Sequence, residues 1–205
     1  MRIGILGTGN VARALAPRLI TAGHDVRLGS RDPGARSGLA LPTTTVQDAA
    51  AHGEVLVNAT PGTESIALLA GLGEDSLSGK VLIDIAVGFT PEGVLSHLGE
   101  SLGEEIQRTF PKVRVVKTFT TVDAAVMVDP DLLSGPSTQF LSGDDPDAKQ
   151  IASALLADLG WPEESQLDLG GISAAAGQEH YAYLFLGIAG ALGTHRFSVR
   201  VVPVK

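Results

Sequence analysis

The chain has 205 residues, 44% of them hydrophobic and 19% charged, with a formal net charge of −8. This length suits one compact domain with a substantial core. The acidic charge balance makes nucleic acid an unfavourable partner, and the lack of cysteine excludes disulfides and thiolate chemistry.

Short apolar runs alternate with stretches of helical periodicity along most of the chain. In chain order, the runs predict strands at 2–6, 24–30, 54–60, 80–87, 113–119 and 138–143, and helices at 10–23, 46–53, 64–72 and from Pro146 onward. Either Asp144 or Asp145 can cap the last of these helices. Such alternation predicts an α/β fold: a Rossmann-like, doubly wound, mostly parallel sheet with helices on both faces.

The pattern changes after about Trp161. A short strand near 164–170, one longer helix from about Ser173 to Leu192 and a final strand at 197–204 are expected there. We therefore place the Rossmann-like domain at residues 1–160 and a small C-terminal α+β subdomain at 161–205.

Residues 181–193 have more apolar surface than one packing face needs, which predicts a homodimer formed through this region. The same stretch is too short to cross a bilayer, so no membrane contact is expected. The start of the chain, MRIGILG, lacks the pattern of a secretory signal, which favours a cytoplasmic protein.

Residues 7–12 read G-T-G-N-V-A and lie between the first expected strand and the first helix. In such a turn Gly7 permits a tight bend, Gly9 lets the backbone approach a pyrophosphate, and the small Ala12 lets the helix pack on the strand. The helix N-terminus then offers free N–H groups to the phosphates. A merely tight turn is the alternative, but the flanking elements favour a dinucleotide-binding loop.

The residues after the second strand indicate which nicotinamide cofactor is preferred. An acidic residue there binds the ribose 2′-hydroxyl, whereas an arginine accommodates a 2′-phosphate. Ser30 and Arg31 occupy this place, and Arg36 follows closely. This arrangement favours NADP, although Ser30 as a turn cap and Arg31 as a solvated charge remain the alternative.

Polar and small residues follow the next strands at the edge where ligands of open α/β sheets bind. Asn58 and Thr60 can bond a ribose or a phosphate, although Thr60 is also an ordinary helix cap. Ala86 and Val87 offer a small apolar wall for a flat ring. Lys117 is either catalytic, solvent-exposed or directed toward the cofactor.

The sequence lacks several other catalytic patterns. Its histidines are scattered without metal-ligand spacing, and no nucleophile elbow or pair of catalytic carboxylates is apparent. We therefore expect no metal site and no catalytic acid or base, and instead hydride transfer that depends on positioning.

Together these segments resemble the NADPH-dependent reductases of the deazaflavin coenzyme F420. The resemblance rests on residues 7–12, 29–31, 58–61, 116–119 and 142–145, and on the late helix with Glu179. It implies that the C-terminal part completes a cleft for the deazaflavin and that a hydride passes directly between the two rings. The chain departs from this family at Thr120, where members commonly have asparagine, and at 173–176, where relatives often have an arginine.

The resemblance also implies roles for individual residues: phosphate contacts at Thr8, Asn10 and Val11, 2′-phosphate contacts at Ser30, Arg31 and Arg36, and ring contacts near Ala86 and Val87. With the residues from the motif analysis, the expected cofactor-binding set is Gly7, Thr8, Gly9, Asn10, Val11, Ser30, Arg31, Arg36, Asn58, Ala59, Thr60, Ala86 and Val87. The expected function is hydride transfer between NADPH and coenzyme F420. An NADPH-dependent reductase of another small acceptor, such as an imine or a ferric chelate, and a non-catalytic NADPH sensor remain alternatives.

Overall fold

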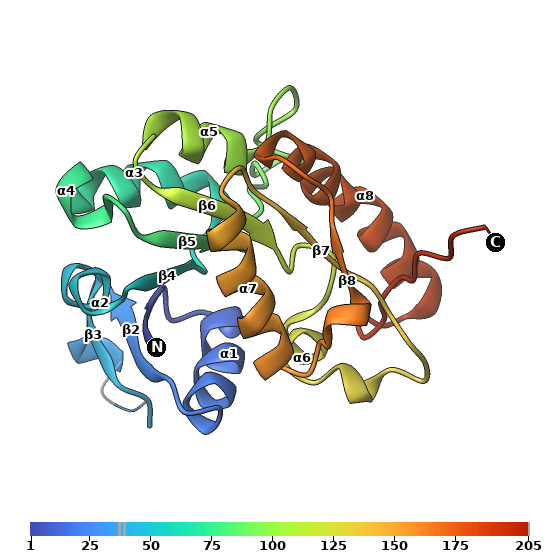
Figure 1. Ribbon diagram of the computed structural model, residues 1–205, viewed down its shortest axis with the longest axis horizontal. Coiled ribbons are helices and arrows are strands. Elements are labelled where there is room, and N and C mark those ends of the chain that lie inside the picture. The colour runs from blue at the N-terminus through green and yellow to red at the C-terminus, as the bar shows by residue number, and fades with distance from the viewer. Residues whose placement is uncertain (37, 39, 205) are drawn as a thin grey trace.

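The computed structural model describes residues 1–36, 38 and 40–204. Within them, one sheet has the strand order β3-β2-β1-β4-β5-β6-β7-β8, and each neighbouring pair is parallel except β6 and β7 (Figure 1). The strands are β1 (Arg2–Leu6), β2 (Asp25–Ser30), β3 (Thr43–Thr45), β4 (Val55–Asn58), β5 (Val81–Asp84), β6 (Arg114–Thr118), β7 (Gln139–Ser142) and β8 (Gln166–Asp168). The chain reverses its direction of travel across the sheet between β1 and β4, which confirms the doubly wound α/β prediction.

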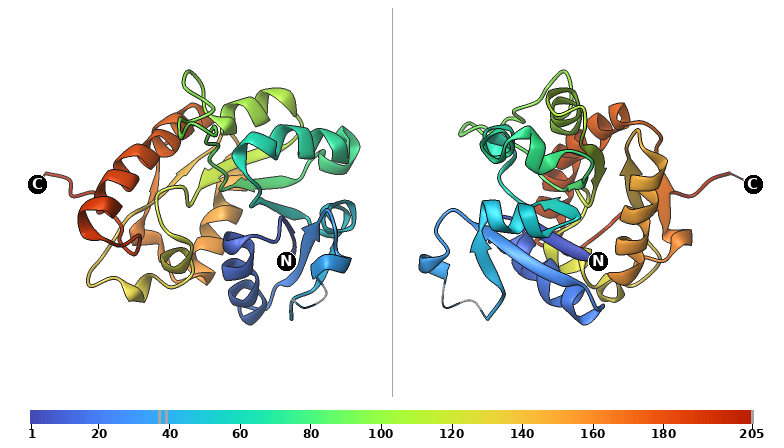
Figure 2. Two further views of the ribbon diagram at one scale, coloured as in Figure 1. Left: turned by 180° about the vertical axis from the view of Figure 1, so that it is seen from behind. Right: turned by 60° about the vertical axis from the view of Figure 1, so that its left-hand side comes forward.

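Alternate residues of the central strands enter two separate hydrophobic cores, because successive side chains of a strand point to opposite faces. In β4, for example, Val55 and Val57 pack into one core while Leu56 packs into the other. These strands are apolar nearly throughout because helices cover both sides of the sheet. Figure 2 shows α7 (Pro146–Asp158) and α3 (Gly62–Leu72) on opposite sides.

The helices divide between the two faces according to the core that they enter. One core receives α1 (Asn10–Thr21), α6 (Ala124–Met127) and α7. The other receives α2 (Val46–His52), α3, α4 (Glu74–Leu77), α5 (Leu102–Thr109) and the first turn of α8 (Ala175–Leu192). No helix of the described residues is long and apolar enough to cross a membrane.

Local signals explain where several helices begin. Pro146 is the first residue of α7, and the Asp145 carboxylate accepts a hydrogen bond from the Ala148 N–H at 2.8 Å, so Asp145 is the cap. The Asp144 carboxylate instead accepts from the Ile172 N–H at 2.9 Å. At α5, Ser101 and Glu104 form a capping box, a signal that the sequence analysis had not used.

The C-terminal region confirms two predicted elements and contradicts one. β8 and α8 are present, but residues 197–204 are not a strand. The carbonyl of Val199 accepts from the Thr138 N–H, and the Val201 N–H donates to the Thr138 hydroxyl. Beyond these contacts the tail extends away from the body, with Val204 98% exposed (Figures 1 and 2). Its β-branched residues favour an extended backbone, but they have no neighbouring strand to complete a ladder.

The chain near residue 161 packs into the core that receives α1, α6 and α7. The Trp161 side chain is 1% exposed, lies in the core that contains β1 and α1, and donates its indole N–H to the Met127 carbonyl at 2.9 Å. In addition, β8 pairs with β7 in the common sheet. Residues after 160 therefore share both the sheet and a core with the residues before it.

Candidate functional site

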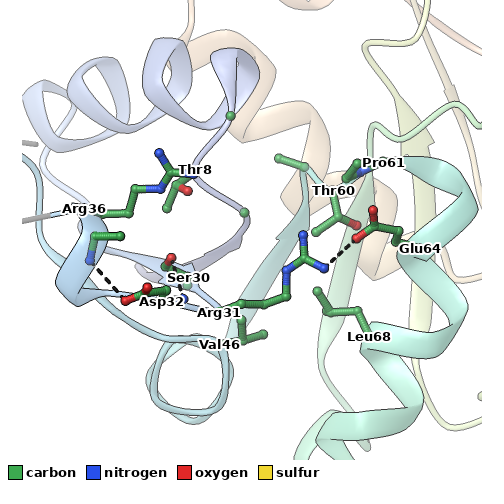
Figure 3. A pocket seen from close by; sticks show the side chains of 15 residues that line it. Thr8, Ser30, Arg31, Asp32, Arg36, Val46, Thr60, Pro61, Glu64 and Leu68 are labelled. Carbon is green, nitrogen blue, oxygen red and sulfur yellow. Dashed lines mark hydrogen bonds and ion pairs between the residues drawn. The ribbon is translucent and has the colours of Figure 1, made fainter.

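A cavity of about 460 Å³ opens at the carboxyl ends of β1, β2 and β4, beside the reversal of strand order. Ligands of open α/β sheets bind at this place because the loops leaving adjacent strands diverge there. Figure 3 shows the cavity, whose lining comes from the glycine-rich turn, the turn after β2, the loop after β4 and the facing sides of α2 and α3. The lining residues are Gly7, Thr8, Gly9, Gly29, Ser30, Arg31, Asp32, Ala35, Arg36, Val46, Ala59, Thr60, Pro61, Glu64 and Leu68.

The glycine-rich turn between β1 and α1 leaves room for an anion. Gly7 has φ = +120°, and a Cβ there would lie 2.7 Å from the Ala59 carbonyl oxygen, so the turn requires glycine. A Cβ on Gly9 would meet no atom within 4 Å, so this backbone faces open space. Gly9 caps α1 without a side-chain hydrogen bond, and the N–H groups of the first turn therefore stay available to a ligand.

Two arginines lie on the rim of the cavity. Figure 3 shows Arg36 beside Thr8, while Arg31 points across the opening toward Glu64. The Arg31 Nη1 lies 3.0 Å from Glu64 Oε2, and their side chains are 78% and 47% exposed. Because an ion pair this exposed contributes about 0–1 kcal/mol, a more highly charged anion can recruit Arg31 at little cost.

Ser30 both supports the turn after β2 and lines the cavity. Its side chain accepts a hydrogen bond from the Asp32 N–H at 3.1 Å, so it does stabilise the turn after β2. Asp32 in turn accepts from the Ala35 N–H at 3.0 Å and supports the short helical turn that carries Arg36. The Ser30 hydroxyl hydrogen is still free to donate, and the residue lines the cavity.

Asn58 does not line this cavity, contrary to its assignment as a direct contact. The side chain is fully buried, and its amide donates to the Ser65 hydroxyl at 2.9 Å and to the Asp84 carboxylate at 2.8 Å. Its carbonyl oxygen accepts from the Thr60 hydroxyl at 2.6 Å. Thr60 does line the cavity, and Asn58 therefore positions it from the protein interior.

Lys117 is neither exposed nor directed into the cavity, which contradicts two of the three interpretations of its sequence position. The side chain is fully buried between Asp84 and Glu179, with Nζ–O distances of 2.8 and 2.7 Å. The sequence did not indicate this network, because Asp84 and Glu179 lie 33 and 62 residues from Lys117 along the chain.

The remaining expected residues do not line the cavity. Asn10 is exposed at the start of α1, and Val11 is partly buried against the core. Ala86 is buried and Val87 half-buried in the loop after β5. Sequence reasoning also missed lining residues: Glu64, in the first turn of α3, and the apolar Val46 and Leu68. Helix periodicity could have indicated that Glu64 and Leu68 share one face of α3.

The strand order, with a glycine-rich turn at its reversal point, defines a Rossmann-type protein of the nucleotide-binding class. Residues 2–88 match the family model described as NADP oxidoreductase, coenzyme F420-dependent. A crystal structure of a candidate F420-dependent NADP reductase from Arthrobacter sp. FB24 superposes with a TM-score of 0.90. The two proteins are 39% identical, and the match covers 99% of this chain and 100% of the other. The chain belongs to this family of F420-dependent NADP oxidoreductases.

Two curated relatives extend the comparison. Metalloreductase STEAP3 from Rattus norvegicus is 32% identical over 177 residues, which are 85% of this chain but only 35% of the rat protein. The F420-dependent NADP reductase of Methanothermobacter marburgensis is 28% identical over 179 residues, 76% of this chain and 78% of that protein. This chain thus spans about a third of the metalloreductase and most of the archaeal reductase.

Proposed function

We propose that this protein binds NADP(H) in the cavity at the strand reversal and exchanges a hydride between it and coenzyme F420. The observation that carries the proposal is the pairing of an open glycine-rich turn with two rim arginines around one cavity. The family match and the similarity to the archaeal F420-dependent NADP reductase support the same pair of substrates.

The proposed contacts follow the parts of the dinucleotide. Gly7, Thr8, Gly9, Asn10 and Val11 contact the pyrophosphate, chiefly through backbone N–H groups. Ser30, Arg31 and Arg36 bind the 2′-phosphate, for which a hydroxyl and two guanidinium groups supply charge-assisted donors. Ala59 and Thr60 contact the ribose side of the nicotinamide, and Ala86 and Val87 form the wall for its ring. Asn58 acts through Thr60.

Deazaflavin suits a site that relies on positioning. Transfer between two stacked redox rings requires correct distance and alignment, and the rings supply the electronic chemistry. A carbonyl acceptor would usually need a protein acid to protonate the developing alkoxide. We propose that residues 161–205 complete the acceptor cleft, with the departures at Thr120 and Ala176 on its side.

The direct test mixes purified protein with NADPH and oxidised coenzyme F420 and follows the visible absorbance of the deazaflavin. We expect rapid bleaching that depends on both protein and NADPH. Tight NADPH binding without bleaching, and without measurable affinity for the deazaflavin, would reject F420 as the acceptor. It would direct attention to Thr120 and Ala176.

A different small acceptor is the second candidate, and the 32% identity to a metalloreductase favours a ferric chelate over other choices. The same assay separates the candidates when F420 is replaced by a ferric chelate and NADPH oxidation is followed. Turnover with the chelate alone would support this candidate.

We also propose a homodimer formed through α8. This helix leaves several large apolar side chains exposed, with fractions of 43–59% for Tyr183, Leu184, Leu186 and Leu192. Burying them against a second copy removes apolar surface from water. One chain has a mass of 21.1 kDa, and light scattering at micromolar concentrations should give twice that mass. A constant monomer mass would contradict the dimer.

A further inference from the structure

The most unusual feature outside the cavity is a buried lysine between two buried carboxylates. Lys117 Nζ donates to Asp84 Oδ2 at 2.8 Å and to the Ala86 carbonyl at 2.5 Å, and it forms an ion pair with Glu179 Oε1 at 2.7 Å. The side chains of Lys117 and Asp84 are 0% exposed and that of Glu179 is 3% exposed. The ammonium group therefore has three buried oxygen neighbours, of which the Asp84 carboxylate and the Ala86 carbonyl accept hydrogen bonds from it.

The Asp84 end of this network holds the loops that leave β4 and β5. Asp84 Oδ1 accepts from the Ala86 N–H at 3.2 Å and from the Asn58 amide at 2.8 Å. Since Lys117 binds the Ala86 carbonyl, both polar groups of Ala86 are clamped by one ion pair. Asn58 then extends the network to Thr60 on the cavity wall.

The Glu179 end holds the C-terminal helix. Its carboxylate accepts from the Leu102 N–H at 2.9 Å and the Gly103 N–H at 3.2 Å, which belong to the first turn of α5. These donors and the positive end of the helix dipole stabilise a buried anion. A continuous series of hydrogen bonds and the Lys117–Glu179 ion pair thus joins α8 and α5 to the loop at Ala86 and to the cavity.

Burial of such a charge cluster is a poor way to gain stability. Desolvation offsets much of the attraction, and well-packed apolar residues of similar volume often serve as well or better. The cluster instead holds its members in one arrangement, because buried polar groups are satisfied only at particular distances and orientations. The cluster fixes the backbone of Ala86, which the proposed function places against the nicotinamide ring.

We infer that Lys117 is a positioning residue for hydride transfer. It holds the Ala86 peptide as the wall for the nicotinamide ring, and through Glu179 it makes that wall depend on the placement of α8. This inference rests on the proposed function, since it presumes that the ring lies against Ala86. It assigns Lys117 no contact with either substrate.

Replacement of Lys117 by methionine keeps an unbranched side chain only one atom shorter and removes its charge and donors. At saturating NADPH we expect hydride transfer to slow roughly tenfold to hundredfold, because misplacement of about 1 Å can cost about 10² in rate. The dissociation constant of NADPH should change less than about threefold, since the phosphate contacts are intact. Single-turnover kinetics with NADPH deuterated at C4 measure the transfer step directly.

Glu179→Gln provides a second variant that leaves the Lys117–Asp84 pair in place, and it should slow transfer in the same direction. Arg108→Ala is the control, because Arg108 forms an exposed ion pair on α5 outside the cavity, and neither NADPH binding nor hydride transfer should change. The inference is overturned if either folded network variant transfers hydride at the normal rate, or loses only NADPH affinity.

Hydrogen exchange on the unaltered protein tests the network without catalysis or folding of a variant. Saturating NADPH should increase protection of the amides of Ala86, Leu102 and Gly103. Protection confined to residues 7–12 and 30–36 would contradict the inference. If F420 is not reduced by the unaltered protein, the proposed acceptor fails, whereas hydrogen exchange and the fluorescence of bound NADPH in Lys117→Met still decide the role of the network.

Discussion

Arg31→Ala should weaken NADPH binding roughly tenfold to hundredfold while NADH binding hardly changes. Charge-assisted hydrogen bonds to the 2′-phosphate contribute about 1.5–3 kcal/mol, and each 1.4 kcal/mol corresponds to about tenfold in affinity. NADH lacks that phosphate and loses nothing. The effect should be reinforced because Glu64, which pairs with Arg31 at 3.0 Å, would remain as an uncompensated anion near the phosphate. Titration of NADPH and NADH by calorimetry or fluorescence measures both constants.

Arg108→Ala is a matched control for this variant. Arg108 also forms an exposed ion pair, with Glu100 at 2.6 Å, but it lies on α5 and does not line the cavity. Its loss should leave both dissociation constants unchanged. The contrast between the two variants should shrink at high salt, because exposed charges are screened. Equal loss of NADPH and NADH affinity in Arg31→Ala, or loss of neither, would remove Arg31 from the proposed 2′-phosphate site.

Trp161→Ala should lower the free energy of unfolding by about 3–5 kcal/mol, a large share of the total for a domain of this size. The indole is 1% exposed and packs in the core with Leu155, Leu156 and Leu159, so its removal leaves a large cavity. The variant also leaves the Met127 carbonyl without its indole donor. Urea unfolding followed by circular dichroism measures the change.

Trp161→Phe separates packing from hydrogen bonding, because it keeps an aromatic ring and removes the indole N–H. We expect it to be less destabilising than Trp161→Ala. An alanine variant within 1 kcal/mol of the unaltered protein would show that the site collapses around the smaller residue. A single unfolding transition for the whole chain would indicate that residues 161–205 do not fold separately, which bears on the division proposed at residue 160.

The sequence predicted those strands and helices whose formation is signalled by residues within the element or at its ends. The apolar runs of β1, β4, β5 and β6 are readable because both faces of a central parallel strand are buried. The start of α7 was predicted from Pro146 and a preceding aspartate, and the structure selects Asp145 over Asp144 as the cap. The final strand was predicted wrongly because a strand needs a partner, and β-branched residues at 197–204 cannot supply one themselves.

The sequence alone also determined most of the candidate cofactor site. The glycine-rich turn and the residues after β2 are contiguous segments, whose conformations follow from glycine at positive φ and from the helix that begins behind them. The carboxyl ends of parallel strands lie at one edge, so the sequence also indicated that these segments would meet.

Only the tertiary structure decided which polar groups face the cavity and which face the interior. Asn58 is the last residue of β4 and Lys117 the penultimate residue of β6, near the edge where the cavity lies, yet both are fully buried. Their partners, Asp84 and Glu179, are distant in sequence, and the direction of each side chain depends on where β5 and α8 pack. The pairing of Arg31 with Glu64 was likewise set by the approach of α3 to the end of β2. Sequence periodicity specifies which face of its own element a residue occupies, whereas a buried charge is satisfied by whatever element packs against that face.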